Sequence, residues 1–213
     1  MFRNMRKNKA EMNRLKITNV LFFYLLMMSS LIGQEQGDQY LKSLQDKFNS
    51  IKDFNASFNQ SIGGKSSLSG KLFFKKENNF RIELGNSTIV SDGATSWNFN
   101  KKENKVIITN YEEDGSLFSI NFLVYQFPNQ CTVTGELDGN LRKLTLIPKS
   151  RTSNLGEVVL WINNDSLIEK LQTNDPASGL IELNFSNIKI NQNLPVSNFQ
   201  FTPPQGSRII DLR

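Results

Sequence analysis

Residues 70–84 read GKLFFKKENNFRIEL and hold two runs in which apolar side chains recur every second position. A period of two places those side chains on one face of an extended chain. The polar stretch between the runs is short enough for a turn, so the segment predicts two antiparallel strands side by side. The side chains expected on the shared face are Leu72, Phe74, Phe80, Ile82 and Leu84.

The same period recurs toward the C-terminus and predicts further strands. Asp92-Gly93 and Asp138-Gly139 are typical turn sequences between such runs. We therefore expect a long antiparallel meander within one domain. Apolar pairs or triplets spaced by two are Val106 and Ile108; Leu144 and Leu146; Val158, Leu160 and Ile162; Ile181, Leu183 and Phe185; and Phe199 and Phe201.

Two segments have a different pattern and predict helices. Apolar residues spaced by three and four from Asp38 to Phe58 indicate an amphipathic helix, which grades into a strand pattern near Phe54. Ser116 to Phe127 is rich in apolar residues without strict alternation, and Pro128 follows it. This second segment predicts a short buried helix or a lid that ends at the proline.

The first 33 residues have the organisation of a secretory signal. A basic region leads into an apolar run from Val20 to Met28, and small residues follow at Ser29, Ser30 and Gly33. A membrane-spanning helix is the alternative, but it needs roughly 20 apolar residues and the run is shorter. We predict a signal peptide over residues 1–33, cleaved near Gly33, and one domain over residues 34–213. Met5 and Met12 are alternative starts.

Removing this signal changes the charge of the chain. Residues 1–33 contain six of the 25 basic residues and one of the 20 acidic residues, which leaves 19 of each. The pI of about 9.3 therefore belongs to the signal. A neutral chain gives no support to nucleic-acid binding.

Cysteine use bears on anchoring and on disulfide formation. The small residues after the apolar run are followed by Gln34, where a lipid-anchored bacterial protein needs a cysteine. We therefore expect a protein in the periplasm without a lipid anchor. The one cysteine, Cys131, has no partner for an internal disulfide and lies in a strand-like stretch, so we expect a small buried side chain.

Catalytic signatures are scarce. The chain has no histidine, and it has no nucleotide-binding or nucleophile motif. Most carboxylates lie at turns, although the sequence leaves open that two of them meet in space. We therefore expect neither an enzyme nor a bound metal or cofactor.

Four segments, in order, resemble the LolA family of periplasmic lipoprotein carriers. Phe54–Gln60 is similar to F-x-A-x-F-x-Q, and Gly70–Arg81 is similar to G-x-L-x-x-K-R-P-x-x-F-R. Val90–Trp97 (VSDGATSW) resembles V-S-D-G-x-x-x-W. The fourth segment is Phe199–Gly206 (FQFTPPQG), with Asp211 shortly after it. The resemblance covers nearly all of the chain after the signal.

This resemblance implies a mainly β (α+β) fold, an incomplete antiparallel barrel wrapped over an N-terminal helix and a short middle lid. It implies a monomer that takes acylated lipoproteins from an inner-membrane ABC transporter and delivers them to the outer membrane, where a receptor is a further expected partner. An apolar cavity would hold the acyl chains. For each expected lining residue, an ordinary core position remains an equal alternative: Leu72, Phe74, Phe80, Ile82, Leu84, Trp97, Phe99, Phe122 and Leu123.

The chain departs from the family pattern at Lys76-Glu77, where many members have Arg-Pro. The resemblance implies that this arginine donates hydrogen bonds to the carbonyls of the lid helix and holds the empty cavity shut. Lysine keeps the charge but lacks the planar donor fork. Lys76 and Arg81 are therefore candidates for a weaker latch; solvent-facing strand charges are the alternative.

Three other functions remain open from the sequence. An outer-membrane receptor with a similar fold would need the missing cysteine. A carrier of other lipids, such as glycolipids or polyketide-like products, would present the same apolar residues. A structural or regulatory module would fill the cavity with its own side chains.

Overall fold

The computed structural model describes residues 33–112, 118–150, 153, 155–175 and 178–213, so all but the last residue of the predicted signal lies outside the described residues. The described residues form a 12-stranded sheet in the order β12-β6-β5-β4-β3-β2-β1-β11-β10-β9-β8-β7. Neighbouring strands are antiparallel except for β12, which pairs with β6 in parallel at one edge. The strands are β1 (Asp53–Ile62), β2 (Lys65–Lys75), β3 (Asn79–Leu84), β4 (Ser87–Asp92), β5 (Thr95–Asn100), β6 (Lys105–Asn110), β7 (Cys131–Asp138), β8 (Leu141–Pro148), β9 (Val158–Ile162), β10 (Ile168–Asp175), β11 (Gly179–Ile190) and β12 (Arg208–Asp211).

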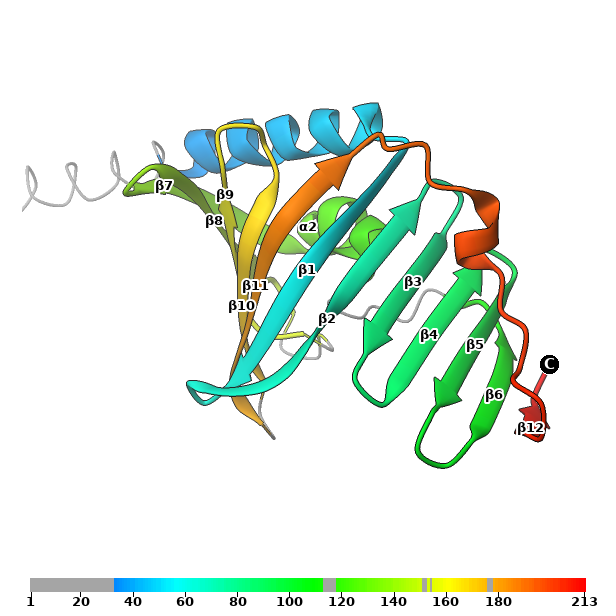
Figure 1. The fold of residues 1–213 in the computed structure, drawn as a ribbon. Helices are drawn as coiled ribbons and strands as arrows, with labels where there is room; N and C mark the ends of the chain where they lie inside the picture. Colours follow the sequence, from blue (N-terminus) through cyan, green and yellow to red (C-terminus); the bar gives the residue numbers. More distant parts are fainter. Residues whose placement is uncertain (1–32, 113–117, 151–152, 154, 176–177) are drawn as a thin grey trace, which may run out of the picture.

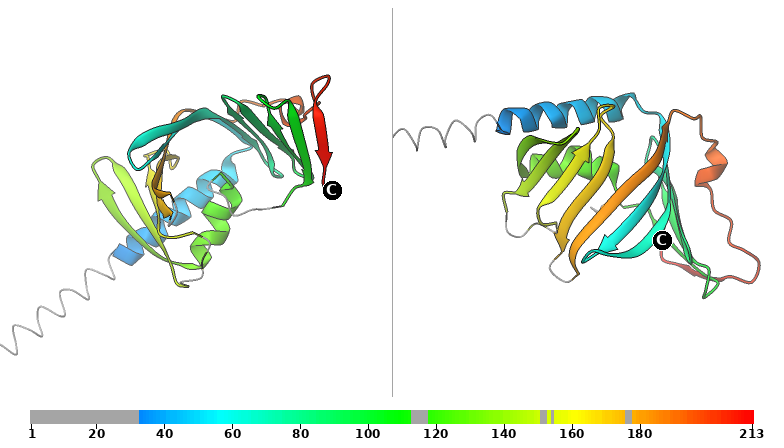
Figure 2. Two further views of the ribbon diagram at one scale, coloured as in Figure 1. Left: turned by 90° about the horizontal axis from the view of Figure 1, so that it is seen from below. Right: turned by 60° about the vertical axis from the view of Figure 1, so that its left-hand side comes forward.

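The sheet is open and curved, and two helices lie on its concave side (Figure 1). We call β1 and β7–β11 the packed half, because the helices cover its concave face (Figure 2). We call β2–β6 and β12 the open half. The prediction of a mainly β fold, an incomplete antiparallel barrel over an N-terminal and a middle helix, is confirmed.

The N-terminal helix covers residues 33–50 of the described chain and ends before the predicted boundary. Phe54 and Phe58 belong to β1 instead. Residues four apart lie on one face of a helix and also on one face of a strand. The spacing of Phe54 and Phe58 was therefore compatible with both structures. Strand β1 begins at Asp53, whose buried carboxylate accepts the backbone N–H groups of Gln192 at 2.7 Å and Leu194 at 3.2 Å.

The middle helix covers residues 120–129 and includes a π-helical turn (Phe122–Gln126) before α2 (Phe127–Asn129). The prediction that Pro128 ends this helix was wrong, because the proline lies within its last turn. Proline has no N–H to donate to the carbonyl of Val124. Gln45 Nε2 of the N-terminal helix donates to that carbonyl at 3.0 Å instead, which ties the two helices together. Residues 116 and 117 lie outside the described residues.

The C-terminal segment covers the convex face of the open half. The predicted strand at Phe199 and Phe201 is absent: Val196–Phe199 forms a 3-10 turn, and β12 follows Gly206. Phe199 is fully buried and Phe201 lies against Phe99, with 5.6 Å between the ring centroids. Both faces of this half therefore carry apolar side chains.

The Asp92-Gly93 turn joins β4 to β5 as expected. Asp92 Oδ1 accepts the backbone N–H groups of Ala94 at 3.0 Å and Thr95 at 2.7 Å. Gly93 has φ of +89°, and a side chain there would lie 2.3 Å from the carbonyl oxygen of Glu77. Only glycine combines that backbone conformation with such a close approach.

Candidate functional site

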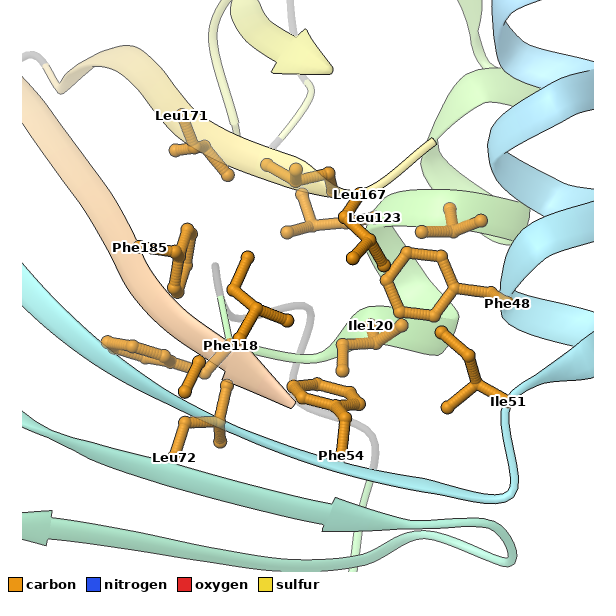
Figure 3. Close-up of a pocket in the computed structure, with 14 residues that line it drawn as sticks. Phe48, Ile51, Phe54, Leu72, Phe118, Ile120, Leu123, Leu167, Leu171 and Phe185 are labelled. Atoms are coloured by element: carbon orange, nitrogen blue, oxygen red, sulfur yellow. The ribbon is translucent and has the colours of Figure 1, made fainter. Parts of the chain in front are cut away.

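An apolar cavity lies between the concave face of the sheet and the two helices (Figure 3). Its empty volume is about 600 Å³, including the part open to solvent. Every side chain that lines it is apolar, and the wall combines aromatic rings with branched aliphatic chains. The lining residues are Phe48, Ile51, Phe54, Ala56, Leu72, Phe118, Ile120, Leu123, Val124, Leu167, Ile168, Leu171, Phe185 and Ile188.

Strand β1 forms the centre of the cavity wall. Phe54 and Ala56 project from alternate positions of this strand, and Ala56 pairs with Leu72 of β2. Phe58, one position further on the same face, is buried in the adjoining core. Gly70 makes room for the ring of Phe58, because a side chain at Gly70 would approach that ring to 2.8 Å. The first two segments of the family-like pattern therefore build one wall.

A β-bulge brings the last wall residue into place. The register between β1 and β11 shifts between Asn55 and Ser57. Opposite this shift, Asn187 has φ of +53°, and its side chain is exposed. The extra residue allows Phe185 and Ile188 to line the same cavity, although they are three positions apart.

Aromatic contacts connect the cavity wall to the helices. Phe48 of the N-terminal helix meets Phe54 edge to face, with 6.1 Å between the ring centroids. Phe54 stacks on Phe74 at 5.3 Å, and Phe58 contacts Phe118 at 5.1 Å. Such large rings stabilise the wall mainly through the apolar area that they bury.

A second, wider cavity adjoins the first on the concave face of the open half. Its empty volume is about 1390 Å³, including open solvent. Phe118 and Ile120 line both cavities, so these two residues lie where the cavities meet. The lining of the second cavity combines apolar side chains with polar ones that include Ser96, Thr109 and Asn121, and we call this polar part of the lining its rim.

The structure distributes the nine predicted lining residues over several places. Leu72 and Leu123 line the first cavity. Phe74, Phe80 and Ile82 line the second. A third group has other surroundings: Leu84 packs half-buried against the core, Phe122 packs on Phe127 with 5.5 Å between the ring centroids, and Trp97 and Phe99 lie on the convex face.

Sequence reasoning missed most residues that line the first cavity. Phe48, Phe54 and Ile51 were in the predicted helix, but the faces of that helix could not be assigned to a cavity. Phe118 was in the predicted lid segment. Phe185 was a predicted strand residue, and its place beside β1 depends on a pairing between distant segments, which no local pattern encodes.

The two latch candidates point to different partners. Lys76 Nζ donates to the backbone carbonyl of Asn49 at 2.6 Å, at the C-terminal end of the N-terminal helix. Positive charge is favourable there because the last carbonyls of a helix lack partners within it. Arg81 Nε donates to Glu83 Oε1 at 2.8 Å, and its Nη1 lies 3.4 Å from the carbonyl of Asn198. Arg81 is thus on the convex face.

Polar contacts between the helices surround Asn49. The hydroxyl of Tyr125 lies 2.9 Å from Asn49 Oδ1 and 3.2 Å from the carbonyl of Gln45. Burial, and then the negative charge of Asp46, raise the pKa of Tyr125. The phenol therefore remains protonated and able to donate.

The structure offers few reactive groups. Burial raises the pKa of the Cys131 thiol to about 11, so the thiol is protonated at neutral pH. Within the described residues, no group of three or more Cys, Asp and Glu side chains is placed to hold a metal ion. None of the helices in the described part is long and apolar enough to cross a membrane.

Comparison with known proteins gives one consistent family. The sequence profile described as "Outer membrane lipoprotein carrier protein LolA" matches residues 49–202. An "Outer-membrane lipoprotein carrier protein" of Legionella pneumophila is 27% identical over 208 residues, covering 90% of this chain and 98% of its own length. A protein of the same name from Cronobacter sakazakii is also 27% identical, with coverages of 87% and 92%.

A solved structure agrees in fold. An uncharacterized conserved protein of Thermus thermophilus superposes with a TM-score of 0.58 at 14% identity. The match covers 82% of this chain and 98% of that one. At this identity the likeness concerns the fold alone.

Proposed function

Because the chain belongs to the LolA family of outer membrane lipoprotein carriers, we propose that it carries acylated lipoproteins across the periplasm. The acyl chains would occupy the first cavity. The observation that carries this proposal is the lining of that cavity, whose fourteen side chains are all apolar. Two relatives named as carriers align over nearly their whole length, which supports the same role.

The energetics of transport explain why such a cavity is needed. Each methylene moved out of water contributes about 0.8 kcal/mol, so one long acyl chain costs on the order of 10 kcal/mol to expose. A lined cavity offsets this cost during transit. The cargo must also leave, and a cavity whose walls can close after release avoids exposing its own apolar surface.

We also propose the mature form of the protein and its transport route between the two membranes. Residues 1–33 act as the export signal, and residues 34–213 form a monomeric carrier that has no lipid anchor. The donor is an inner-membrane ABC transporter, and a receptor at the outer membrane accepts the cargo. The carrier binds and releases its cargo without catalysing a reaction, which accords with the non-enzymatic character of the family.

Filling the cavity tests this proposal. Ala56 is buried in the cavity wall, so Ala56→Phe should reduce the volume left for an acyl chain. Ser57 points to the other face of the same strand, and Ser57→Phe adds the same ring there as a matched control. Native mass spectrometry should find acylated peptide on the wild type and on Ser57→Phe, and little on Ala56→Phe.

Unchanged occupancy in a folded Ala56→Phe protein would contradict binding in this cavity.

Depleting the protein in its source organism tests transport itself. Lipoproteins should then accumulate at the inner membrane. Normal lipoprotein sorting together with retained lipid binding would favour the second candidate, a carrier of other lipids, since an all-apolar lining recognises acyl chains of any origin.

A further inference from the structure

The second cavity adjoins the first and differs from it in polarity. The two cavities share Phe118 and Ile120. The lining of the first is apolar, while that of the second combines apolar residues such as Phe80 and Ile82 with the hydroxyl and amide groups of its rim. This change in polarity along one concave surface resembles the change along an acylated molecule.

The rim of the second cavity is almost uncharged. Its polar residues include Ser96, Thr109 and Asn110 from the sheet and Asn78 from the β2–β3 turn, which are neutral donors and acceptors. Glu112 is the one ionised side chain among the described residues that line it, and no lysine or arginine is present in that lining. The charge that the described residues bring to this rim is therefore negative.

Nearby cations are directed elsewhere. Lys75 Nζ donates to the carbonyl of Leu194 at 2.8 Å, and Lys76 Nζ donates to the carbonyl of Asn49. Arg213 follows Leu212, which lines the cavity, and its guanidinium pairs with Asp211 at 2.6 Å. Each of these cations would have to give up a partner in order to reach a ligand in the cavity.

The start of the middle helix is a further source of positive potential at this rim. Ser119 Oγ accepts the backbone N–H of Phe122 at 3.3 Å. One of the N–H groups that could bind an anion at the helix N-terminus is thus already used. The known solutions for phosphate binding, an arginine fork, a lysine or several free amides, are not assembled among the described residues of this rim.

We propose that the second cavity selects cargo by the charge of its polar end: it accepts neutral glyceryl, ester and amide groups and disfavours phosphate. This inference rests on the proposed carrier function and deepens it. Acylated protein termini carry glyceryl and amide groups without phosphate, whereas membrane phospholipids carry an anionic phosphate. A carrier working between two membranes would then discriminate its cargo from a large excess of phospholipid with equivalent chains.

Two ligands with the same chain test this selection. Monopalmitoylglycerol and palmitoyl-lysophosphatidylglycerol differ in the phosphoglycerol group, and each can displace the fluorescent probe N-phenylnaphthylamine from the purified protein below its micellar concentration. The neutral ligand should displace the probe at a concentration about tenfold lower, since burying an unpaired phosphate near a carboxylate is unfavourable. Equal displacement by the two ligands would overturn the selection and leave the carrier function intact.

Variants with a changed charge at the rim locate the effect. Ser96→Lys places a cation in the cavity and should reduce the difference between the ligands to about twofold. Thr132→Lys, on an exposed position of β7, adds the same charge far from the cavity and should preserve the difference. If Ser96→Lys does not fold, Glu112→Gln provides the test. This variant should reduce the ratio of the two displacing concentrations by about two- to threefold.

Two results would count against the inference in different ways. An unchanged ratio in folded Ser96→Lys, or in Glu112→Gln, would show that charge at this rim does not set the preference. A wild-type protein that fails to bind the probe at all would overturn both the selection and the carrier function on which it rests.

Discussion

The two halves of the sheet share one sequence pattern but use it differently. In the packed half, the concave side chains Leu144, Leu160 and Leu183 are fully buried beneath the helices. In the open half, Phe80 and Ile89 on the same side remain half-buried around the second cavity. The difference comes from what covers each face, since period-two alternation is present in both. One face of one sheet can thus hold fully buried side chains in one half and half-buried side chains around a cavity in the other.

The largest expected effect is in the packed half. Phe127 is 1% exposed and anchors the middle helix, so Phe127→Ala should lower the free energy of unfolding by about 3–5 kcal/mol. Urea denaturation measures the change. Leu137 on edge strand β7 is 68% exposed, and Leu137→Ala should change stability by less than about 0.5 kcal/mol. Similar losses for the two variants would contradict a tight core beneath the helices.

A smaller and more local effect is expected in the open half. Phe199 is fully buried against β3 and β4 from the convex side. Phe199→Ala should lower the opening free energy of amides in β3–β6 by about 2–4 kcal/mol and leave β8–β10 nearly unchanged. Hydrogen exchange measured by mass spectrometry distinguishes the two halves.

Val196 lies on the same turn as Phe199 and is 59% exposed, so Val196→Ala is the control. It should leave exchange in both halves close to the wild type. If Phe199→Ala accelerates exchange equally in β8–β10, the two halves unfold as one cooperative unit.

Local patterns predicted much of this fold. The 70–84 segment forms β2 and β3 as expected, with Leu72 opposite Ile82 and Phe74 opposite Phe80. The Asp-Gly turns and both helices are also present. These features depend on neighbours in sequence, which is why periodicity and turn chemistry identify them.

The features that were missed depend on distant contacts. Trp97 and Phe99 alternate as cavity residues would, but the C-terminal segment covers their face and makes it a second core. The end of the N-terminal helix depends on Asp53 binding the backbone near residue 192. The bulge at Asn187, which positions Ile188, is visible only once β11 is paired with β1.

The titration of Cys131 on β7 probes the packed half. The pKa of the buried Cys131 thiol rises from an ordinary 9.0 to about 11, chiefly through burial, partly offset by Lys149. Between these values the unfolded chain loses the proton and the folded chain keeps it, so stability should fall as pH rises from 9 to 11. The thiol should account for a decrease of about 2–3 kcal/mol in the free energy of unfolding over this pH range.

Cys131→Ala isolates that contribution, because tyrosines and lysines titrate in both proteins. The variant should be less stable at pH 7, and its deficit relative to the wild type should shrink toward pH 11. A deficit that stays constant across this range would show that the thiol does not resist ionisation in the folded state.

The smallest expected effect on stability concerns the contact between the two halves at Lys76. Its ammonium joins the β2–β3 turn of the open half to Asn49 on the N-terminal helix. The residue is exposed, so Lys76→Ala should lower the free energy of unfolding by less than about 1 kcal/mol.

The same contact restrains the N-terminal helix beside the cavity, and its loss should speed release of a bound acyl probe about two- to threefold. Lys71→Ala, at an exposed position on the convex face of β2, controls for lost charge. Stopped-flow release rates that match the wild type would exclude a latch at Lys76.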